Sequence, residues 1–354
     1  MSGRRAVGLD IGTTSVRAAQ VSYGKDHTKL ERFGQVALPF GAVRGGEVVD
    51  PDAVAAALKQ LWSQVKFSTK RVIVGIANQR VVVRQIDLPW MPLPELRKSL
   101  PFHVADVIPI PVDEAVLDLH PLEEIVGEDG SRRQRVLLVA ASRDMIRSTL
   151  DALSLAGLKP QAVDLTSFAV LRALGTPDAL GMSQNAEALV EVGASVTNIV
   201  VHQGGVPRFV RILLLGGSDL TEIIADRMGV SIEEAEAIKH STALPPDPAS
   251  VGIDPVTRVL EAAATTWVEE VRGSLDYYLA QSDSVRIGRV VLSGGGALLA
   301  GLANRLSLAT RIPVELASPM ARLEIGRTKL TPAQLAYADP LASVPVGLAL
   351  GLGA

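Results

Sequence analysis

The chain has 354 residues, more than one hydrophobic core usually spans, so two or more domains are expected. Hydrophobic residues make up 47% of the sequence, and the net charge of −3 offers no electrostatic case for nucleic-acid binding. The chain has no cysteine, which excludes disulfides and thiolate metal sites and fits a reducing compartment. No run reaches the roughly 18–20 apolar residues of a membrane span. We therefore expect a soluble protein without direct membrane insertion.

Residues 6–17 predict a short buried strand that ends on a carboxylate and then turns sharply. Val7 and Leu9 lead into Asp10, and Gly12 precedes three hydroxyl residues. The N–H groups of such a turn converge on one point, as in a backbone nest that binds phosphate. A nearby carboxylate suits hydrated Mg²⁺. An ordinary Gly-Thr hairpin turn explains these residues equally well. The three hydroxyl residues are Thr13, Thr14 and Ser15.

The same pattern returns at residues 187–204, where a strand reaches Glu191, Gly193 follows, and a second strand runs back. A third strand follows each copy, over residues 29–38 and 206–215. Two such units suggest two half-domains facing each other across a cleft, with both turns clamping the phosphates of one nucleotide. The duplication favours this interpretation over two ordinary turns. The small residues after the second glycine are Ala194 and Ser195.

Between the two units, the sequence predicts a helix, a strand and then a separate module. Asp50 is a typical N-cap of a helix over residues 50–66, and residues 71–78 form an apolar run typical of a buried strand. Residues 81–158 then change character. They contain a strand, the proline-rich segment 89–94, a helix, two strands and a second helix. We interpret them as an inserted α+β module.

The rest of the chain alternates strands and helices. A strand over residues 160–165 leads into a helix, and a strand over residues 289–292 ends at the glycines of Ser293-Gly-Gly-Gly. Ser231 and Glu234 form a capping box. The helices expected in this part of the chain cover residues 166–174, 217–228, 232–240, 256–281, 297–309, 331–338 and 341–351.

These motifs, in this order, resemble those of the actin/Hsp70/FtsA ATPase superfamily. Asp10-Ile-Gly-Thr-Thr and Glu191-Val-Gly-Ala-Ser resemble its two phosphate loops, and Ser293-Gly-Gly-Gly resembles its adenosine loop. Ala235-Glu236-Ala-Ile-Lys239 resembles its nucleoside-holding helix. Within the superfamily, the chain is most similar to the PilM family of the type IV pilus assembly platform. The features that carry this similarity are the module at 81–158, Phe209-Val-Arg211-Ile and Gly216-Gly217-Ser218-Asp-Leu-Thr221.

The resemblance implies an α/β, actin-like (ribonuclease H-like) duplicated fold, with two lobes around a nucleotide cleft and an inserted 1C-type subdomain. The implied subdomains are 1A (1–80, 159–186 and 331–354), 1C-like (81–158), 2A (187–216 and 286–330) and 2B (217–285).

The resemblance also implies ATP and Mg²⁺ as cofactors. Asp10 and Glu191 would hold Mg²⁺ through water, and Asp164 would position the attacking water or instead cap the following helix. Glu236 and Lys239 would reach the ribose or base, although an intrahelical ion pair explains their spacing too. The glycines of the adenosine loop would let its backbone approach the nucleoside, or simply form a turn. The full set of implied nucleotide contacts is Asp10, Gly12, Thr13, Thr14, Ser15, Gly193, Ala194, Ser195, Glu236, Lys239, Gly294, Gly295 and Gly296.

One position departs from the superfamily pattern, because Glu191 stands where Asp is usual. The extra methylene displaces the carboxylate by about one bond length, which matters when positioning tolerance is below ~1 Å. We therefore expect nucleotide binding with slow turnover or none. One alternative is a small-molecule kinase, but no Asp/Asn/His cluster offers a general base. Another is an FtsA- or MreB-like filament that binds membrane, but residues 346–354 lack the Lys and Arg of a basic amphipathic tail.

The resemblance implies a cytoplasmic scaffold, peripheral to the inner membrane, that docks the N-terminal peptide of a PilN-like membrane protein beside other platform proteins. The oligomeric state is left open, with a homo-oligomer among the alternatives. Trp90 and Met91 lie among three prolines that cannot donate backbone hydrogen bonds, which favours their exposure to a partner. We expect most of an apolar stripe on the next helix to pack on the module's own strands. The stripe consists of Leu96, Leu100, Val104 and Val107.

Overall fold

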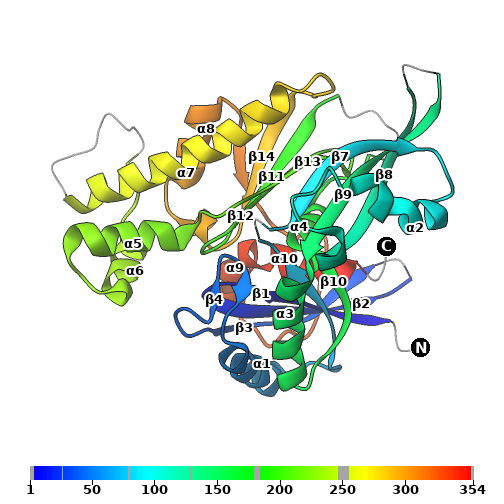
Figure 1. The fold of residues 1–354 in the computed structure, drawn as a ribbon. Coiled ribbons are helices and arrows are strands. Elements are labelled where there is room, and N and C mark those ends of the chain that lie inside the picture. Colours follow the sequence, from blue (N-terminus) through cyan, green and yellow to red (C-terminus); the bar gives the residue numbers. More distant parts are fainter. Residues whose placement is uncertain are drawn as a thin grey trace.

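The computed structural model describes residues 4–25, 27–78, 80–127, 130–178, 184–245 and 255–351. Two lobes, each built on a mixed β-sheet, lie one above the other, and a small third sheet lies beside them (Figure 1). The first sheet has the strand order β10-β6-β1-β2-β3-β16, and the second has the order β13-β12-β11-β14-β15. The boundaries of the four subdomains stay a prediction.

The two lobes repeat one strand arrangement. In the first lobe, β1 (Arg5–Ile11) pairs antiparallel with β2 (Ser15–Tyr23) and parallel with β6 (Arg71–Ile76). In the second lobe, β11 (Ala186–Val192) pairs in the same two ways with β12 and β14. The duplication expected from the motifs is therefore present in the hydrogen-bonded strands. The remaining strands are β3 (Thr28–Ala37), β10 (Lys159–Leu165), β12 (Thr197–Gln203), β13 (Val206–Leu213), β14 (Ile287–Ser293), β15 (Val314–Leu316) and β16 (Glu324–Ile325).

Helices of the first lobe cover its sheet closely. Asp50 caps α1 (Pro51–Val65) as expected, because its side chain accepts a hydrogen bond of 3.0 Å from the N–H of Ala53. A Cβ atom at Gly8 in β1 would lie 2.1 Å from the carbonyl oxygen of Pro345 in α10, so only glycine permits this approach. The other helices here are α3 (Arg143–Leu155), α4 (Thr166–Leu174), α9 (Pro332–Ala338) and α10 (Ser343–Leu350).

In the second lobe, α5 (Gly217–Met228), α6 (Ile232–Ser241) and α7 (Pro255–Leu279) follow β13, and α8 (Leu302–Thr310) follows β14. The buried rings of Trp267 and Tyr278 belong to this lobe's core. One expectation was wrong, because α8 does not start directly after the glycines. A short 3-10 turn over Gly296–Leu298 comes first, and Gly301, at φ +91°, precedes the helix. Glycine adopts that left-handed conformation readily, so the chain can bend there.

The inserted module forms a three-stranded sheet with one helix on it. Its strand order is β7 (Val82–Pro89), β9 (Arg132–Ser142) and β8 (Ala115–Val126), and α2 (Leu93–Val104) packs on this sheet. Most of the predicted apolar stripe is buried in the module's core, which confirms the expectation that it packs there. The sequence pattern predicts these two strands over residues 114–122 and 135–141, joined by a charged turn at residues 127–130. In the structure β8 continues to Val126 and β9 begins at Arg132, and residues 128 and 129 of the turn lie outside the described residues.

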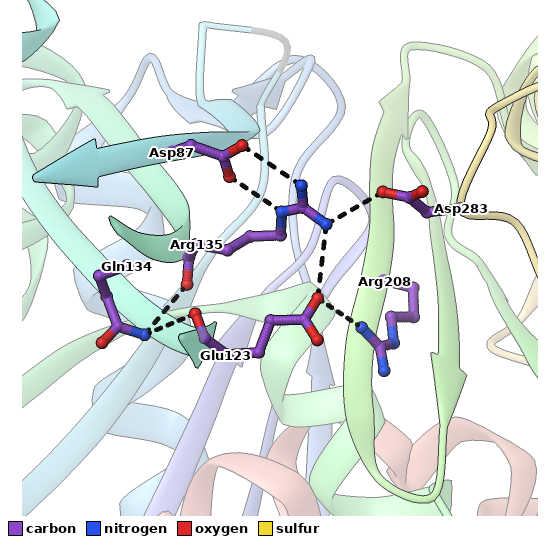
Figure 2. Close-up of polar contacts among 6 residues, drawn as sticks. All are labelled: Asp87, Glu123, Gln134, Arg135, Arg208 and Asp283. Carbon is purple, nitrogen blue, oxygen red and sulfur yellow. Dashed lines mark hydrogen bonds and ion pairs between the residues drawn. The ribbon is translucent and has the colours of Figure 1, made fainter. Parts of the chain in front are cut away.

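A network of charged side chains joins the module to the second lobe (Figure 2). The guanidinium of Arg135 in β9 donates two hydrogen bonds, of 2.9 Å and 3.2 Å, to the carboxylate of Asp87 in β7. The same guanidinium reaches Asp283, beyond α7, at 3.0 Å. Arg135 and Arg208 in β13 each lie 3.5 Å from Glu123 in β8. Module and second lobe therefore meet through Arg135 and Glu123.

A short hairpin that sequence periodicity did not predict lies between β3 and α1. It consists of β4 (Val43–Arg44) and β5 (Glu47–Val48). The side-chain amide of Asn78 donates a hydrogen bond to the Gly45 carbonyl and so ties the hairpin to the segment after β6. Within the part of the chain that the structure describes, no helix combines the length and apolarity needed to cross a bilayer.

Candidate functional site

A cavity of about 450 Å³ lies between the two lobes. Its walls come from the turns after β1 and β11, the start of α5, one face of α6 and the glycines after β14. These segments are far apart in the sequence but meet at the boundary between the lobes, where α4 of the first lobe packs against β11 and β12 of the second (Figure 1).

The two turns have the same hydrogen bond at the same position. The N–H of Gly12 donates to the carbonyl of Ser15 at 3.0 Å, and the N–H of Gly193 donates to the carbonyl of Val196 at 2.8 Å. The Ser15 hydroxyl is buried and has no hydrogen-bond partner among the described residues. Because buried polar groups are normally satisfied, this hydroxyl is available to a ligand in the cavity.

Two carboxylates, one from each lobe, face the cavity two residues before these glycines. Burial raises the pKa of Asp10, and the Arg17 guanidinium at 3.6 Å partly opposes that change. Burial, together with the negative charge of Asp10, raises the pKa of Glu191 to about 7. The carboxylates therefore repel each other across the cavity, an arrangement that a bound cation would relieve.

On the opposite wall, Glu236 and Lys239 do more than pair with each other. Lys239 Nζ donates to the Gly217 carbonyl at 2.9 Å and to the Thr221 hydroxyl at 2.8 Å, both in α5. It also donates to Glu236 Oε2 at 2.7 Å. Burial acts to raise the pKa of Glu236, but these hydrogen bonds from Lys239 and Thr221 leave it lowered. The pair thus fixes α6 against the start of α5 and remains part of the cavity wall.

The three glycines after β14 have different neighbours, because the first packs against the second acidic turn and the other two line the cavity. Gly294 has φ +86°, and a Cβ there would lie 2.4 Å from the Val192 carbonyl and 2.8 Å from Glu191 Oε1. It therefore lets the loop pack against the second acidic turn. Gly295 and Gly296 line the cavity.

The structure brings most of the predicted site residues together but leaves three away from the cavity lining. Ser195 and Gly294 lie in loops beside it, and Asp164 points elsewhere. The Asp164 carboxylate forms an ion pair with Arg172 in α4 and accepts a hydrogen bond of 2.8 Å from the N–H of Leu165. The predicted residues that line the cavity are Asp10, Gly12, Thr13, Thr14, Ser15, Glu191, Gly193, Ala194, Glu236, Lys239, Gly295 and Gly296.

Sequence reasoning missed several polar residues that also line the cavity, among them Arg17, Thr166 and Asn198. Arg17 lies directly opposite Asp10 in the β1–β2 pair, and Asn198 lies opposite Glu191 in the β11–β12 pair. Strand register, counted back from each turn, would have found both. Thr166 begins α4 and brings a hydroxyl to the cavity, two residues after Asp164.

The fold and its cavity define an actin-like protein, as the sequence resemblance predicted. One similar structure is the "PilM-PilN type IV pilus biogenesis complex", with a TM-score of 0.84 and 27% identity over 98% of both chains. Another is MreB5 of Spiroplasma citri bound to ADP, with a TM-score of 0.53 and 12% identity over 97% of this chain and 94% of that one. At that identity, the second likeness concerns the fold alone.

The chain belongs to the family described as "Type IV pilus assembly protein PilM", which matches residues 8–352. A curated relative is the cell division protein FtsA of Bacillus subtilis. It is 23% identical over 256 residues, a match that covers 66% of this chain and 57% of FtsA. The predicted place of the chain near FtsA in the actin-like superfamily is confirmed.

Proposed function

We propose that this protein binds ATP with Mg²⁺ in the cavity between its lobes and acts as an adaptor of the pilus assembly platform. The observation that carries the nucleotide proposal is the pair of matching turns, each with its carboxylate, facing one cavity from opposite lobes. Two further features fit a phosphorylated ligand. The Ser15 hydroxyl lacks a partner among the described residues. A Cβ at Gly217 would point between Lys239, Gly193 and Gly296, so glycine keeps that space open.

In this proposal each wall has its own task. Backbone N–H groups and hydroxyls of the turns at Gly12 and Gly193 hold the phosphates, and Asp10 and Glu191 hold Mg²⁺ through water. The metal, when bound, would neutralise charge on the phosphates. Glu236 and Lys239 reach the ribose or base, while the backbone of the glycine-rich loop packs against the nucleoside.

The geometry around α4 supports slow hydrolysis or none. Asp164, the residue predicted to position water, is engaged by Arg172 and Leu165. Near this point α4 contributes the hydroxyl of Thr166, which is a poor general base compared with a carboxylate or imidazole. We propose that ATP acts mainly as a bound ligand that holds the lobes together, with Asp164 in a structural ion pair.

Calorimetric titration of the whole chain with Mg-ATP tests the nucleotide proposal. We expect saturable binding and a raised melting temperature, because ligand selectively stabilises the folded state. Asp10→Ala should abolish most of both effects, since the metal loses a carboxylate. Asp106→Ala removes an exposed aspartate of the module and serves as the matched control. If the Asp10 variant binds Mg-ATP like the wild type, the assignment of the first turn is wrong.

The partner in this proposal is the N-terminal peptide of a PilN-like membrane protein, which would place the chain at the cytoplasmic face of the inner membrane. Family membership and the likeness to a PilM–PilN complex support it. On the module, Trp90 is 40% exposed. Its ring lies under the Arg132 guanidinium at 4.3 Å, and its N–H donates to Glu124 at 3.0 Å. The indole is thus held rigidly at the surface, which suits an apolar contact.

Titration of a labelled PilN-type peptide onto wild type and Trp90→Asp tests this contact. We expect the substitution to weaken peptide binding at least tenfold and to spare ATP binding. Phe102→Asp is the control, because Phe102 is 87% exposed on α2 of the same module. Equal affinities for wild type and Trp90→Asp would remove Trp90 from the site. No binding to wild type would contradict the adaptor proposal.

A further inference from the structure

The two acidic turns differ in the residue that faces each carboxylate. In the first lobe, Asp10 lies opposite Arg17, whose guanidinium carries a charge of the opposite sign. In the second lobe, the equivalent residue opposite Glu191 is Asn198. Asn198 Nδ2 donates a hydrogen bond of 2.9 Å to Glu191 Oε2. The duplicated scaffold thus places a charged partner beside one acid and a neutral partner beside the other.

The Asn198 amide is held from the other lobe. Its Oδ1 atom accepts a hydrogen bond of 3.1 Å from the hydroxyl of Ser167 in α4, a helix of the first lobe. Ser167 is 1% exposed and Asn198 is 2% exposed, so water does not compete at either group. An amide has one accepting end and one donating end. The Ser167 hydroxyl donates to the accepting end, and the ionised Glu191 carboxylate, which can only accept, takes the donating end.

We propose that Asn198 is a positioning residue for Glu191, and that Ser167 sets its orientation across the boundary between the lobes. This inference rests on the proposed binding of Mg²⁺ and nucleotide. A neutral amide donor stabilises an ionised carboxylate without forming an ion pair that competes with a metal. The chain of hydrogen bonds also suits the longer glutamate, because it fixes the side chain whose extra methylene adds freedom.

The hydrogen-bond chain from Ser167 through Asn198 to Glu191 makes the position of this carboxylate depend on the contact between the lobes. Ser167 and Asp10 belong to the first lobe, and Asn198 and Glu191 belong to the second. If the lobes separate at Ser167, the Asn198 amide can rotate and Glu191 loses its fixed donor. The second carboxylate is therefore aligned for the metal only when the floor of the cleft is closed.

A purely structural role would also explain two buried hydrogen bonds, so the test must separate metal-dependent from general effects. We suggest measuring the affinity for a fluorescent ATP analogue with Mg²⁺ and with EDTA, for the wild type and Ser167→Ala. This substitution removes only a hydroxyl group, so we expect the chain to stay folded, and the melting temperature of the variant checks this. Ser274→Ala is the matched control, because Ser274 is a buried serine of α7 whose hydroxyl bonds the Glu270 carbonyl.

We expect Ser167→Ala to weaken binding in Mg²⁺ by roughly fivefold, the scale of one lost hydrogen bond, and to leave binding in EDTA unchanged. Asn198→Ala should show the same pattern. The double variant should be no weaker than the stronger single variant, because both residues act in one chain. Equal losses with and without Mg²⁺, or no loss in either condition, would overturn the inference while wild-type binding stands. Absence of Mg²⁺-dependent binding in the wild type would overturn the proposed nucleotide function and the inference with it.

Discussion

Two of the polar contacts that join the parts of this molecule, among the residues that the structure describes, have opposite chemistry. On the floor of the cleft, Ser167 and Asn198 meet as uncharged, buried groups that water does not reach. At the outer edge, the bridge between module and second lobe consists of partly exposed charges gathered around Arg135 (Figure 2). The first contact is a single buried hydrogen bond of 3.1 Å, and the second is a set of ion pairs of 2.9 Å, 3.0 Å and 3.5 Å around one guanidinium.

This difference predicts different mechanical behaviour. A buried hydrogen bond is costly to break, because the separated groups find no water. Exposed ion pairs are screened by salt and exchange readily with water, so each contributes little to stability. We therefore expect the cleft floor to act as a firm hinge and the module bridge to open and re-form. A module that binds a partner can then move without disturbing the nucleotide site.

The largest expected effect concerns the cleft floor. Asn198→Leu should lower the local free energy of unfolding by about 3 kcal/mol, because the Glu191 carboxylate and the Ser167 hydroxyl both lose a buried partner. Native-state hydrogen exchange along β11 and β12 measures this change. Exchange rates in these strands that match the wild type would mean that the floor is not the firm contact.

A smaller effect is expected at the module bridge. Arg135→Ala should destabilise the module by about 2 kcal/mol. The substitution removes the bidentate ion pair with Asp87, and it leaves three carboxylates without the cation that they share. Arg135→Lys is the matched comparison, since lysine keeps the charge but lacks the planar fork. The rate of hydrogen exchange in β7 and β9 should be higher in Arg135→Ala than in the wild type, and the increase should be smaller in Arg135→Lys. Equal protection in all three proteins would show that the network adds nothing.

The parts predicted correctly from the sequence have strong local signals. Asp50 caps α1 and Ser231 caps α6 as expected, because capping depends only on residues three positions away. The acidic turns at Asp10 and Glu191 are likewise local, a strand ending on a carboxylate before a glycine. Their meeting at one cavity followed from recognising the duplication, which local patterns alone do not reveal.

The parts that were missed depend on register or on contacts between distant segments. Arg17 and Asn198 face the acids only because the hairpins pair in a particular register. The charged residues that begin β9, among them Arg132, look like a turn in the sequence. They extend the strand because Arg132 meets Glu124 across the hairpin at 2.7 Å. The two-residue strands of β4 and β5 are too short to show any periodicity.

The third expected effect, in order of size, is the pH dependence of Mg-ATP binding, which we attribute to Glu191 beside the cleft floor. Glu191 has its pKa raised from 4.5 to about 7, so it is largely protonated at pH 6 and ionised at pH 8. Because roughly a tenth of the group is ionised one pH unit below its pKa, Mg-ATP should bind on the order of tenfold more weakly at pH 6 than at pH 8. Calorimetric titrations at both pH values measure this, and Glu191→Gln should remove most of the dependence.

The same shift acts on stability with the opposite sign. The folded protein binds this proton more tightly than the unfolded chain does, so Glu191 makes the nucleotide-free protein less stable as pH rises from 4.5 to about 7. A melting temperature that is as sensitive to pH in Glu191→Gln as in the wild type would contradict this account.

The smallest expected effect concerns Asp283, the residue of the bridge that follows α7. Asp283 is the most exposed partner of Arg135, at 65%. Asp283→Asn should destabilise the contact between module and second lobe by only about 0.5 kcal/mol, because water screens an exposed pair. The difference from wild type should shrink further as salt shortens the Debye length from about 10 Å at 0.1 M to about 3 Å at 1 M. Hydrogen exchange in β7 and β13 at both salt concentrations measures it. A loss that persists in 1 M salt would mean that ions do not screen the contact between Asp283 and Arg135, and it would weaken the contrast with the cleft floor.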